Sequence, residues 1–261
     1  MSVPIWHVSA FARTPFAGNP AAVCLLEQER SADWLRAVAG QMNLSETAFL
    51  WPEGGEWRLR WFTPRVEVDL CGHATLASAH VLYETGRHPS TSAMRFRTRS
   101  GVLTVRPEGH RLSMDFPARP ATAAPLPPGL SMLGEVRWSG QNGMDWLAEL
   151  ADETAVRSLA PDMALLAALP VRGLIVTARS ARPEFDFVSR FFAPAVGVPE
   201  DPVTGSAHCC LGPHWSARLG KDDLRAAQLS ERGGELGVRV AGERVHLSGS
   251  AVTVLRGELL A

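Results

Sequence analysis

The segment 200-EDPVTGSAHCCLGPHW-215 places an acid, a hydroxyl group, two histidines and two adjacent cysteines within a short stretch of chain. Three kinds of chemistry fit these residue types. The histidines and cysteines could bind a metal ion, or the thiols could act as nucleophiles. Alternatively, Asp201 and Ser206 could act on a substrate while the other side chains pack in the interior.

A metal site in this segment is not expected, because a helix would separate its ligands. On a helix that begins at Ser206, consecutive side chains point about 100° apart, so two adjacent cysteines do not face one ion together. The spacing also differs from the CxxC and HExxH patterns of zinc sites. We therefore expect no metal ligands, and we predict packing roles for His208, Cys209, Cys210 and His214.

A similar arrangement of residues occurs in the first half of the chain. Residues 61-WFTPRVEV-68 align with 191-FFAPAVGV-198, and 72-GHA-74 then aligns with 205-GSA-207. In both copies a strand pattern, a proline turn and a glycine precede a helix pattern of similar length. The shared order favours an internal duplication over chance similarity.

The two glycines of this repeat each begin a predicted helix, and such helix starts can bind anions. The first backbone N–H groups of a helix have no intrahelical acceptor and carry the positive end of the helix dipole. If the two halves of the chain face each other, Gly72-His73 and Gly205-Ser206 would hold a carboxylate-bearing small molecule. The alternative is that both are ordinary helix starts facing solvent.

Two acidic residues accompany these helix starts. Glu46 lies in 43-NLSETAFLW-51, where apolar neighbours predict burial, a raised pKa and proton exchange near neutral pH. A Glu in such a pattern can also lie at the surface. Asp201 precedes Gly205 in a loop bounded by proline, where it is either a catalytic group or a turn-forming residue.

The composition indicates a globular protein with almost balanced charge. Apolar residues make up 46% and charged residues 20% of the 261 residues, and the formal net charge is −1. We therefore expect no nucleic-acid or membrane partner. No apolar run is long enough for a spanning helix, and the N-terminal residues do not resemble a signal peptide, which favours a cytoplasmic protein.

The choice of cofactors is limited by the near absence of lysine. Lys221 is the only lysine, and its Gly-Lys-Asp-Asp context is typical of a surface turn. A pyridoxal-phosphate enzyme or a Schiff-base aldolase needs a buried lysine, so neither is expected. The chain also lacks the glycine-rich motifs of dinucleotide and nucleoside-triphosphate sites. None of these cofactors is therefore expected.

Hydrophobic periodicity predicts many strands and few helices. Strands are predicted at residues 3–9, 46–51, 57–63, 93–98, 101–106, 111–116, 173–178, 184–192, 236–240, 244–248 and 251–256. Helices are predicted at 31–42, 74–85, 145–159, 161–169 and 206–219, with a bend or break near Gly212-Pro213 in the last. Residues 117–130, rich in proline and alanine, are typical of a linker. We predict two domains, 1–117 and 118–261, with the final strand able to pack back on the first.

Four segments together resemble the PhzF-like family, the phenazine-biosynthesis isomerase-like proteins of the diaminopimelate-epimerase-like superfamily. The segments are 15-PFAGNPAAVC-24, 44-LSETAFL-50, 62-FTPRVEVDLCGHATLASAHVL-82 and 183-PEFDFVSRFFAPAVGVPEDPVTGSAHCCLGPHW-215. The resemblance covers most of the chain, and the predicted linker matches least. It implies an α/β (α+β) fold of two similar domains related by a pseudo-twofold axis. Each domain would be a β-roll around a central α-helix, with the active site between them.

The resemblance also implies roles for individual residues. Glu46 would carry the proton in a cofactor-independent isomerisation, and His73 and Asp201 would be the other catalytic residues. The substrate-binding residues would be Gly72, Gly205, Ser206 and Asn19. The implied substrate is a small carboxylate-bearing metabolite, and family members are typically homodimers.

Two other functions remain open. Racemases and epimerases of the superfamily use two facing thiols. Cys71 matches one of these positions, but Thr204 stands at the other, so we expect Cys71 to pack beside the site. An epimerase of an amino or hydroxy acid would use Glu46 with Cys71 or Asp201 as opposing bases. A non-catalytic small-ligand-binding protein on the same fold is the second alternative.

Overall fold

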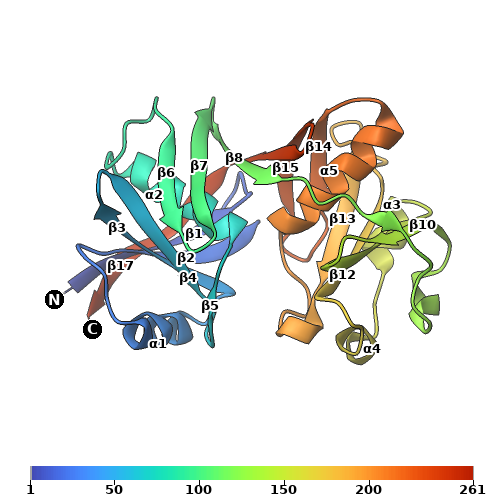
Figure 1. Ribbon diagram of the computed structural model, residues 1–261, viewed down its shortest axis with the longest axis horizontal. Coiled ribbons are helices and arrows are strands. Elements are labelled where there is room, and N and C mark those ends of the chain that lie inside the picture. Colours follow the sequence, from blue (N-terminus) through green and yellow to red (C-terminus); the bar gives the residue numbers. More distant parts are fainter. Residues whose placement is uncertain (1, 261) are drawn as a thin grey trace. The chain divides into compact units, whose positions relative to one another are not determined.

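The computed structural model describes residues 2–260, which form two compact units (Figure 1). Unit 1 comprises the chain up to Asp115 together with the segment from Ser248 onwards, and unit 2 comprises Phe116–Leu247. The chain passes between the units within strands β8 (Arg111–Pro117) and β16 (Arg244–Gly249). The final strand belongs to unit 1.

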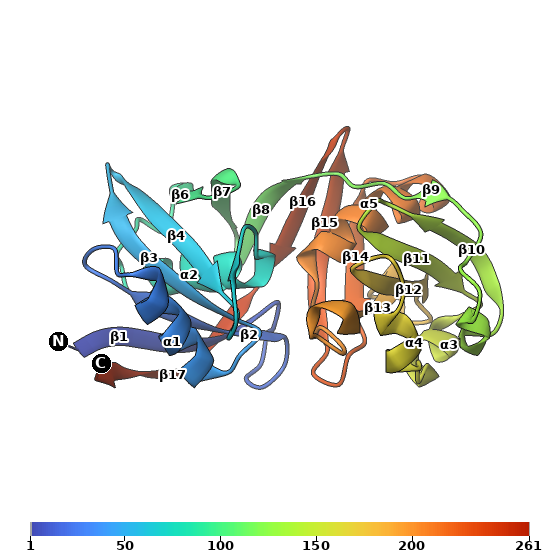
Figure 2. The ribbon, with the colours of Figure 1, turned by 60° about the horizontal axis from the view of Figure 1, so that its bottom comes forward.

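Unit 1 is a mixed sheet with one helix on each face (Figure 2). Its other elements are β1 (Ser2–Ala10), β2 (Asn19–Leu25), α1 (Ala32–Met42), β3 (Glu46–Glu53), β4 (Glu56–Phe62), β5 (Glu67–Val68), α2 (Gly72–Glu84), β6 (Met94–Thr98), β7 (Gly101–Glu108) and β17 (Ala251–Leu260). The strands pair in the order β17, β1, β2, β3, β4, β6, β7, β8. They curl around α2, while α1 packs against β3 and β4.

Strands β2 and β3 are buried on both faces, which explains their continuous apolar sequence. They run parallel, with Cys24 opposite Phe49. These two side chains join Leu35 and Val38 of α1 in one hydrophobic cluster. Residues one position along each strand point to the opposite face, toward α2. Strands covered on both faces show apolar runs instead of the alternation of a half-exposed strand.

Helix α2 is enclosed around most of its circumference. Every residue from His73 to Leu82 except His80 is buried. A helix buried on all sides is apolar all round, and its many alanines allow the strands to approach closely. None of the described helices is long and apolar enough to cross a membrane.

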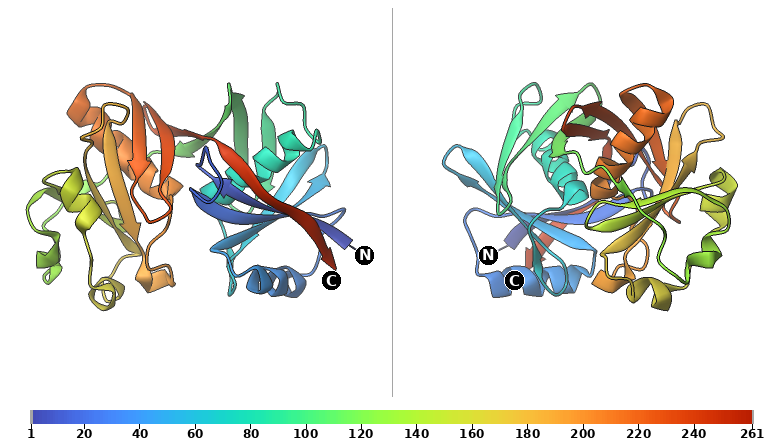
Figure 3. Two further views of the ribbon diagram at one scale, coloured as in Figure 1. Left: turned by 180° about the vertical axis from the view of Figure 1, so that it is seen from behind. Right: turned by 45° about the vertical axis from the view of Figure 1, so that its right-hand side comes forward.

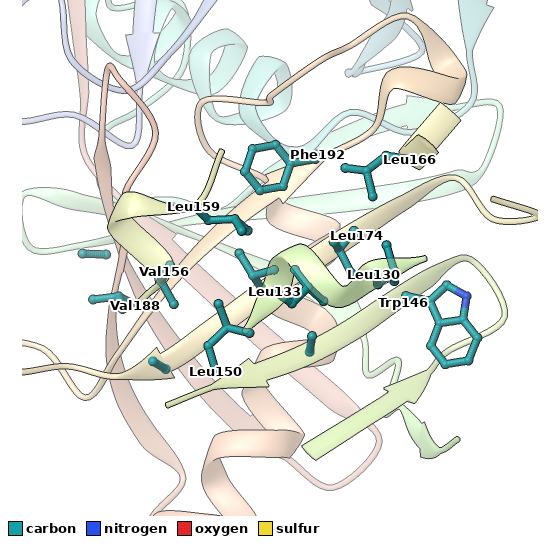
Figure 4. Packing of buried hydrophobic residues seen from close by; sticks show 14 residues of the cluster. Leu130, Leu133, Trp146, Leu150, Val156, Leu159, Leu166, Leu174, Val188 and Phe192 are labelled. Atoms are coloured by element: carbon teal, nitrogen blue, oxygen red, sulfur yellow. The ribbon is translucent and has the colours of Figure 1, made fainter. Parts of the chain in front are cut away.

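Unit 2 repeats this plan. Its other elements are β9 (Thr122–Ala123), η1 (Leu130–Leu133), β10 (Val136–Gln141), β11 (Asp145–Leu150), α3 (Glu153–Ser158), α4 (Met163–Ala167), β12 (Gly173–Arg179), β13 (Phe187–Phe192), η2 (Pro194–Val196), α5 (Gly205–Leu219), β14 (Asp223–Gln228) and β15 (Gly234–Ala241). Helix α5 packs against β14 and β15. The opposite face of β11, β12 and β13 packs against η1, α3 and α4 through a cluster that includes Leu133, Val156, Leu166 and Phe192 (Figure 4).

The two units pair their strands in the same series. In unit 1, β1–β2 is antiparallel, β2–β3 parallel, β3–β4 antiparallel, β4–β6 parallel and β6–β7 antiparallel. In unit 2, β10–β11, β11–β12, β12–β13, β13–β14 and β14–β15 repeat this series. The central helix comes after β4 in unit 1 (α2) and after the equivalent strand β13 in unit 2 (α5). The predicted internal duplication and the fold class of two similar α/β units are confirmed.

The helix predicted at residues 145–159 is wrong. Asp145–Leu150 forms β11, and α3 begins only after Asp152, whose side chain accepts from the N–H of Ala155. Strand β11 runs parallel to β12 and is covered on both faces. Its apolar residues therefore do not alternate, and a short apolar run does not distinguish a buried strand from a buried helix.

The sequence predicts a bend or a break near Gly212-Pro213, and the break does not occur, because α5 is continuous through Pro213. A proline has no N–H, so inside a helix it leaves the carbonyl four residues earlier without a donor. For Pro213 this is the carbonyl of Cys209. The N–H of Arg119 donates to this carbonyl at 2.9 Å. The bond lost to proline is thus replaced from outside the helix. Arg119, within residues 117–130 that were predicted as a linker, is thus hydrogen-bonded to the central helix of unit 2.

The final strand, β17, pairs antiparallel with β1 along almost the whole length of both strands (Figure 3). Ser2 lies opposite Leu260 and Ala10 lies opposite Ala251, with a register shift after His7. Residues from the two ends of the described chain therefore lie side by side in unit 1.

Candidate active site

Unit 1 brings Glu46, Cys71 and His73 together where two elements begin. Glu46 is the first residue of β3, and His73 is the second residue of α2, after the N-cap residue Cys71. Nε2 of His73 lies 3.4 Å from Oε2 of Glu46, and Sγ of Cys71 lies 3.5 Å from Nδ1 of His73. Cys71, which we expected to pack beside the site, is in direct contact with the imidazole.

The environment of Glu46 favours its protonated form. Burial raises the pKa of the carboxyl group, and a hydrogen bond with Cys71 offsets only part of this effect. A carboxyl group with a raised pKa exchanges its proton closer to neutral pH than an exposed Glu does. The Glu46 side chain as a whole is 18% exposed.

Asn19 is fully buried at the start of β2. Ala21 lies opposite Glu46 in the parallel pair β2–β3, so Asn19, two residues earlier, points to the same face of the sheet as Glu46. The loop before Asn19 turns at Gly18, where φ is +68°. A Cβ at Gly18 would lie 2.2 Å from the carbonyl oxygen of Ala10 in β1, so only glycine fits there.

In unit 2, Asp201 is fixed just before α5 by Thr204 and Gln228. The hydroxyl of Thr204 donates to Oδ2 of Asp201 at 2.5 Å, and Nε2 of Gln228 donates to the Asp201 carbonyl at 2.7 Å. Oε1 of Gln228 accepts from the N–H of Thr204 at 2.9 Å. The side chain of the N-cap residue Thr204 does not cap α5, and its hydroxyl oxygen accepts from Nε2 of Gln228 at 3.1 Å. The first N–H groups of the helix, beginning with Gly205, are left without a side-chain cap.

Ser206 belongs to a second cluster in unit 2, centred on Arg172. Nη2 of Arg172 donates to Oγ of Ser206 at 3.0 Å. Nε and Nη2 of Arg172 also donate to the two carboxylate oxygens of Asp145, at 2.9 and 2.5 Å. Asp145 is only 1% exposed, and the guanidinium group lies 5.0 Å from the centre of the Phe191 ring.

Sequence reasoning missed Arg172, Asp145 and Gln228. Asp145 was assigned to the start of a helix, although it begins β11. Gln228 is the last residue of β14, a strand that periodicity did not predict. Arg172 directly precedes the predicted strand at 173–178, and a charged residue at the start of an apolar strand is the only signal the sequence offers for it.

The family of the chain follows from comparison with known sequences. The sequence profile of the PhzC-PhzF family, phenazine biosynthesis-like protein, matches residues 8–257. The chain belongs to this family. An uncharacterized isomerase from Halalkalibacterium halodurans is 49% identical over 263 residues, which cover 100% of this chain and 99% of that protein.

Solved structures agree with the PhzC-PhzF assignment. The crystal structure of a PhzF family phenazine biosynthesis protein from Enterococcus faecalis matches with a TM-score of 0.96 and 40% identity, covering 100% of both chains. A hydroxyproline epimerase from Agrobacterium vitis matches with a TM-score of 0.65 and 12% identity, over 99% of this chain and 92% of that one. The latter shows the fold alone. Together they confirm the diaminopimelate-epimerase-like fold.

Within residues 2–260, one group of three side chains of metal-binding type lies close together. It consists of Glu46, Cys71 and His73. One ligand atom from each lies within 4.8 Å of the others. Oxygen, sulfur and nitrogen donors of this kind suit Zn²⁺. Such an ion would occupy the carboxylate of Glu46 and the imidazole of His73, which lie 3.4 Å apart.

The histidines and cysteines of α5 pack in the interior, as predicted. His208, Cys209, Cys210 and His214 are all buried. Burial raises the pKa of Cys209 and of Cys210 to about 12, so both thiols remain protonated and unreactive at neutral pH. Nε2 of His214 lies 3.0 Å from Oε2 of Glu149.

His208 should make the stability of the chain depend on pH. Its Nδ1 lies 2.8 Å from the Thr204 carbonyl, which makes this nitrogen the donor, and burial lowers the pKa of the imidazole to about 4. In an unfolded chain the pKa is about 6.5, so below that pH the unfolded state binds a proton that the folded state does not. The free energy of unfolding should therefore fall by about 3 kcal/mol as the pH decreases from ~6.5 toward the pKa of His208 in the folded chain.

The measurement is urea unfolding of the protein and of His208→Gln between about pH 7 and pH 4. Glutamine retains an N–H donor but does not titrate in this range. The variant should lose about 3 kcal/mol less than the parent over the same interval. Equal losses in the two proteins would contradict the prediction.

Proposed function

We propose that the chain is a cofactor-independent isomerase of a small carboxylate-bearing metabolite, in which Glu46 moves one proton. The Glu46 carboxylate removes a proton from a carbon next to an activating group, and the resulting carboxylic acid returns it to another carbon of the conjugated system. The double bond shifts, and no atom is gained or lost. The raised pKa of Glu46, in contact with His73, is the observation that carries this proposal.

Each of the two helix starts is proposed as a place where a substrate carboxylate can bind. Neither α2 nor α5 is capped by the side chain of its N-cap residue, which supports anion binding by the N–H groups that follow, at Gly72 and Gly205. In this proposal Asp201 and Asn19 position the substrate.

The test is a screen of small carboxylates by thermal shift, followed by NMR of the compounds that bind in D₂O. A ligand at about 100 times its Kd raises the stability of the folded chain by roughly 3 kcal/mol. The proposed isomerase should introduce deuterium at the carbon that gains the proton and shift a double bond. A screen in which neutral compounds stabilise the protein as well as carboxylates do would count against a carboxylate substrate.

An epimerase of an amino or hydroxy acid is the second candidate, and the position of Cys71 favours it. The Cys71 thiol touches the same imidazole that Glu46 touches, so a second acid–base group is within the cluster. The NMR experiment separates the two reactions. Deuterium at the α-carbon with inversion of configuration indicates the epimerase, and a shifted double bond indicates the isomerase.

A further inference from the structure

The strand register shows which residues of the two units correspond. Phe62 and Phe192 are equivalent in the internal repeat. Phe62 of β4 lies opposite Thr47 in β3, and Phe192 of β13 lies opposite Leu174 in β12. Thr47 and Leu174 therefore correspond, and so do the residues that begin β3 and β12.

Glu46, which begins β3, thus corresponds to Gly173, which begins β12. Unit 2 has no space for a side chain at this position, because a Cβ on Gly173 would lie 2.5 Å from the carbonyl oxygen of Phe192. The side chain that reaches the start of the central helix comes from the preceding residue, Arg172.

In both units a charged side chain from the start of a strand contacts the second residue of the central helix, but the sign of its charge differs. In unit 1, the acid Glu46 contacts His73, the second residue of α2, at 3.4 Å. In unit 2, the cation Arg172 contacts Ser206, the second residue of α5, at 3.0 Å. His73 and Ser206 are equivalent in the repeat. The duplication has placed an acid in one copy and a permanent cation in the other.

The hydrogen bonds among Arg172, Asp145 and Ser206 leave donors for one more acceptor. Asp145 and Ser206 engage Nε and Nη2 of Arg172, and no hydrogen bond found among residues 2–260 uses its Nη1. The Ser206 oxygen accepts from Arg172, so the hydroxyl proton can be donated elsewhere. The Arg172 side chain is 28% exposed, and Asp145 and Phe191 hold its orientation. A carboxylate is the acceptor that two such donors suit best.

We propose that Arg172 is a further substrate-binding residue, whose Nη1 together with the Ser206 hydroxyl donates to the substrate carboxylate. This inference rests on the proposed function and assigns its parts. In it, Arg172 of unit 2 holds the anionic end of the substrate. The bidentate pair with Asp145 fixes the guanidinium before the substrate arrives, so little side-chain freedom is lost on binding.

The test compares the binding of benzoate and of its neutral isostere benzamide by titration calorimetry. The parent protein should bind benzoate more tightly than benzamide. Arg172→Gln should weaken benzoate binding about tenfold or more and benzamide binding by much less, whereas Arg172→Lys should recover part of the preference. Arg179→Gln is the matched control, because Arg179 is exposed at the other end of β12 and should leave both affinities unchanged.

A second variant guards against a loss of folding. Arg172→Gln leaves the buried Asp145 carboxylate without its cation, so the double variant Arg172→Gln with Asp145→Asn removes both charges of the pair together. A folded double variant that keeps the preference for benzoate of the parent protein overturns the role of Arg172. A parent protein with no such preference overturns this inference and the carboxylate assignment alike.

Failure of the proton-transfer mechanism would be seen in a different variant. If Glu46→Gln abolishes exchange while the Arg172 variants bind as the parent does, the proposed function stands and the role of Arg172 falls. If Glu46→Gln remains active while the Arg172 variants lose their preference for benzoate, the role of Arg172 stands and the Glu46 mechanism falls.

Discussion

Replacement of Glu46 by glutamine is expected to lower turnover about a thousandfold, which is within the range for loss of a positioned acid–base group. Glutamine has nearly the same shape, but its amide does not exchange a proton in this role. Substrate affinity should change less than about tenfold, because binding is assigned to other groups. The measurement is the rate of deuterium incorporation into substrate by NMR, with the dissociation constant from calorimetry.

The Glu46→Gln variant should remain folded, and this separates loss of chemistry from loss of structure. Burial raises the pKa of Glu46, so ionising this group at neutral pH costs stability in the folded state. A neutral glutamine removes this cost, and the melting temperature should rise or stay the same. Activity that depends on the ionised carboxylate should decline with falling pH at a pH above the value of about 4.3 usual for Glu.

Two further variants make the Glu46 result specific. Glu53→Gln changes an exposed glutamate at the other end of β3 and should leave turnover unchanged. Cys71→Ala should reduce turnover less than about tenfold if the thiol only packs against His73. A loss as large as that of Glu46→Gln would make Cys71 a second acid–base group and favour the epimerase. A fully active Glu46→Gln variant would show that the proposed mechanism is wrong.

Gly18→Ala is expected to destabilise unit 1 by about 3 kcal/mol. Two effects add. An alanine at φ +68° is strained, and its Cβ would lie 2.2 Å from the carbonyl oxygen of Ala10, so either the loop or β1 must move. The thermal midpoint should fall by roughly 6–12 °C, as measured by circular dichroism. Because Asn19 follows directly, substrate binding should weaken as well.

Gly54→Ala is the matched control for this substitution. Gly54 has φ +60° in the turn between β3 and β4, and a Cβ there meets no atom within 4 Å. It therefore carries the backbone strain without the collision and should cost only about 1 kcal/mol. Equal losses at Gly18 and Gly54 would show that β1 accommodates the added methyl group without cost.

Local signals were sufficient to predict the repeated strand, turn and helix start of each unit. The repeat around Phe62 and Phe192 is a short pattern that follows from turn chemistry. The glycines that begin α2 and α5 follow from the chemistry of helix starts, and the structure contains both features. The start of β11 was missed because a strand covered on both faces has no periodicity. The continuity of α5 through Pro213 was missed because the replacement donor comes from a segment far away in the sequence.

Some residues of the candidate site could be predicted from short motifs, and others could not. Glu46 and His73 stand in recognisable motifs, and the structure places them in contact. The cluster of Arg172 and Asp145 depends on the parallel pairing of β11 with β12, and strand register over such distances is not encoded in any short motif. Residues that act through register therefore become visible only in the folded chain.

The pairing of β17 with β1 also has a consequence for how the chain is made. Unit 2 is continuous from Phe116 to Leu247, so all of its strands are synthesised before β17. At roughly 5–20 residues per second, the outer edge of β1 remains unpaired for about 10–50 s. An open edge is a template for pairing with other chains during that time. The unit that carries Glu46 is thus translated first and completed last.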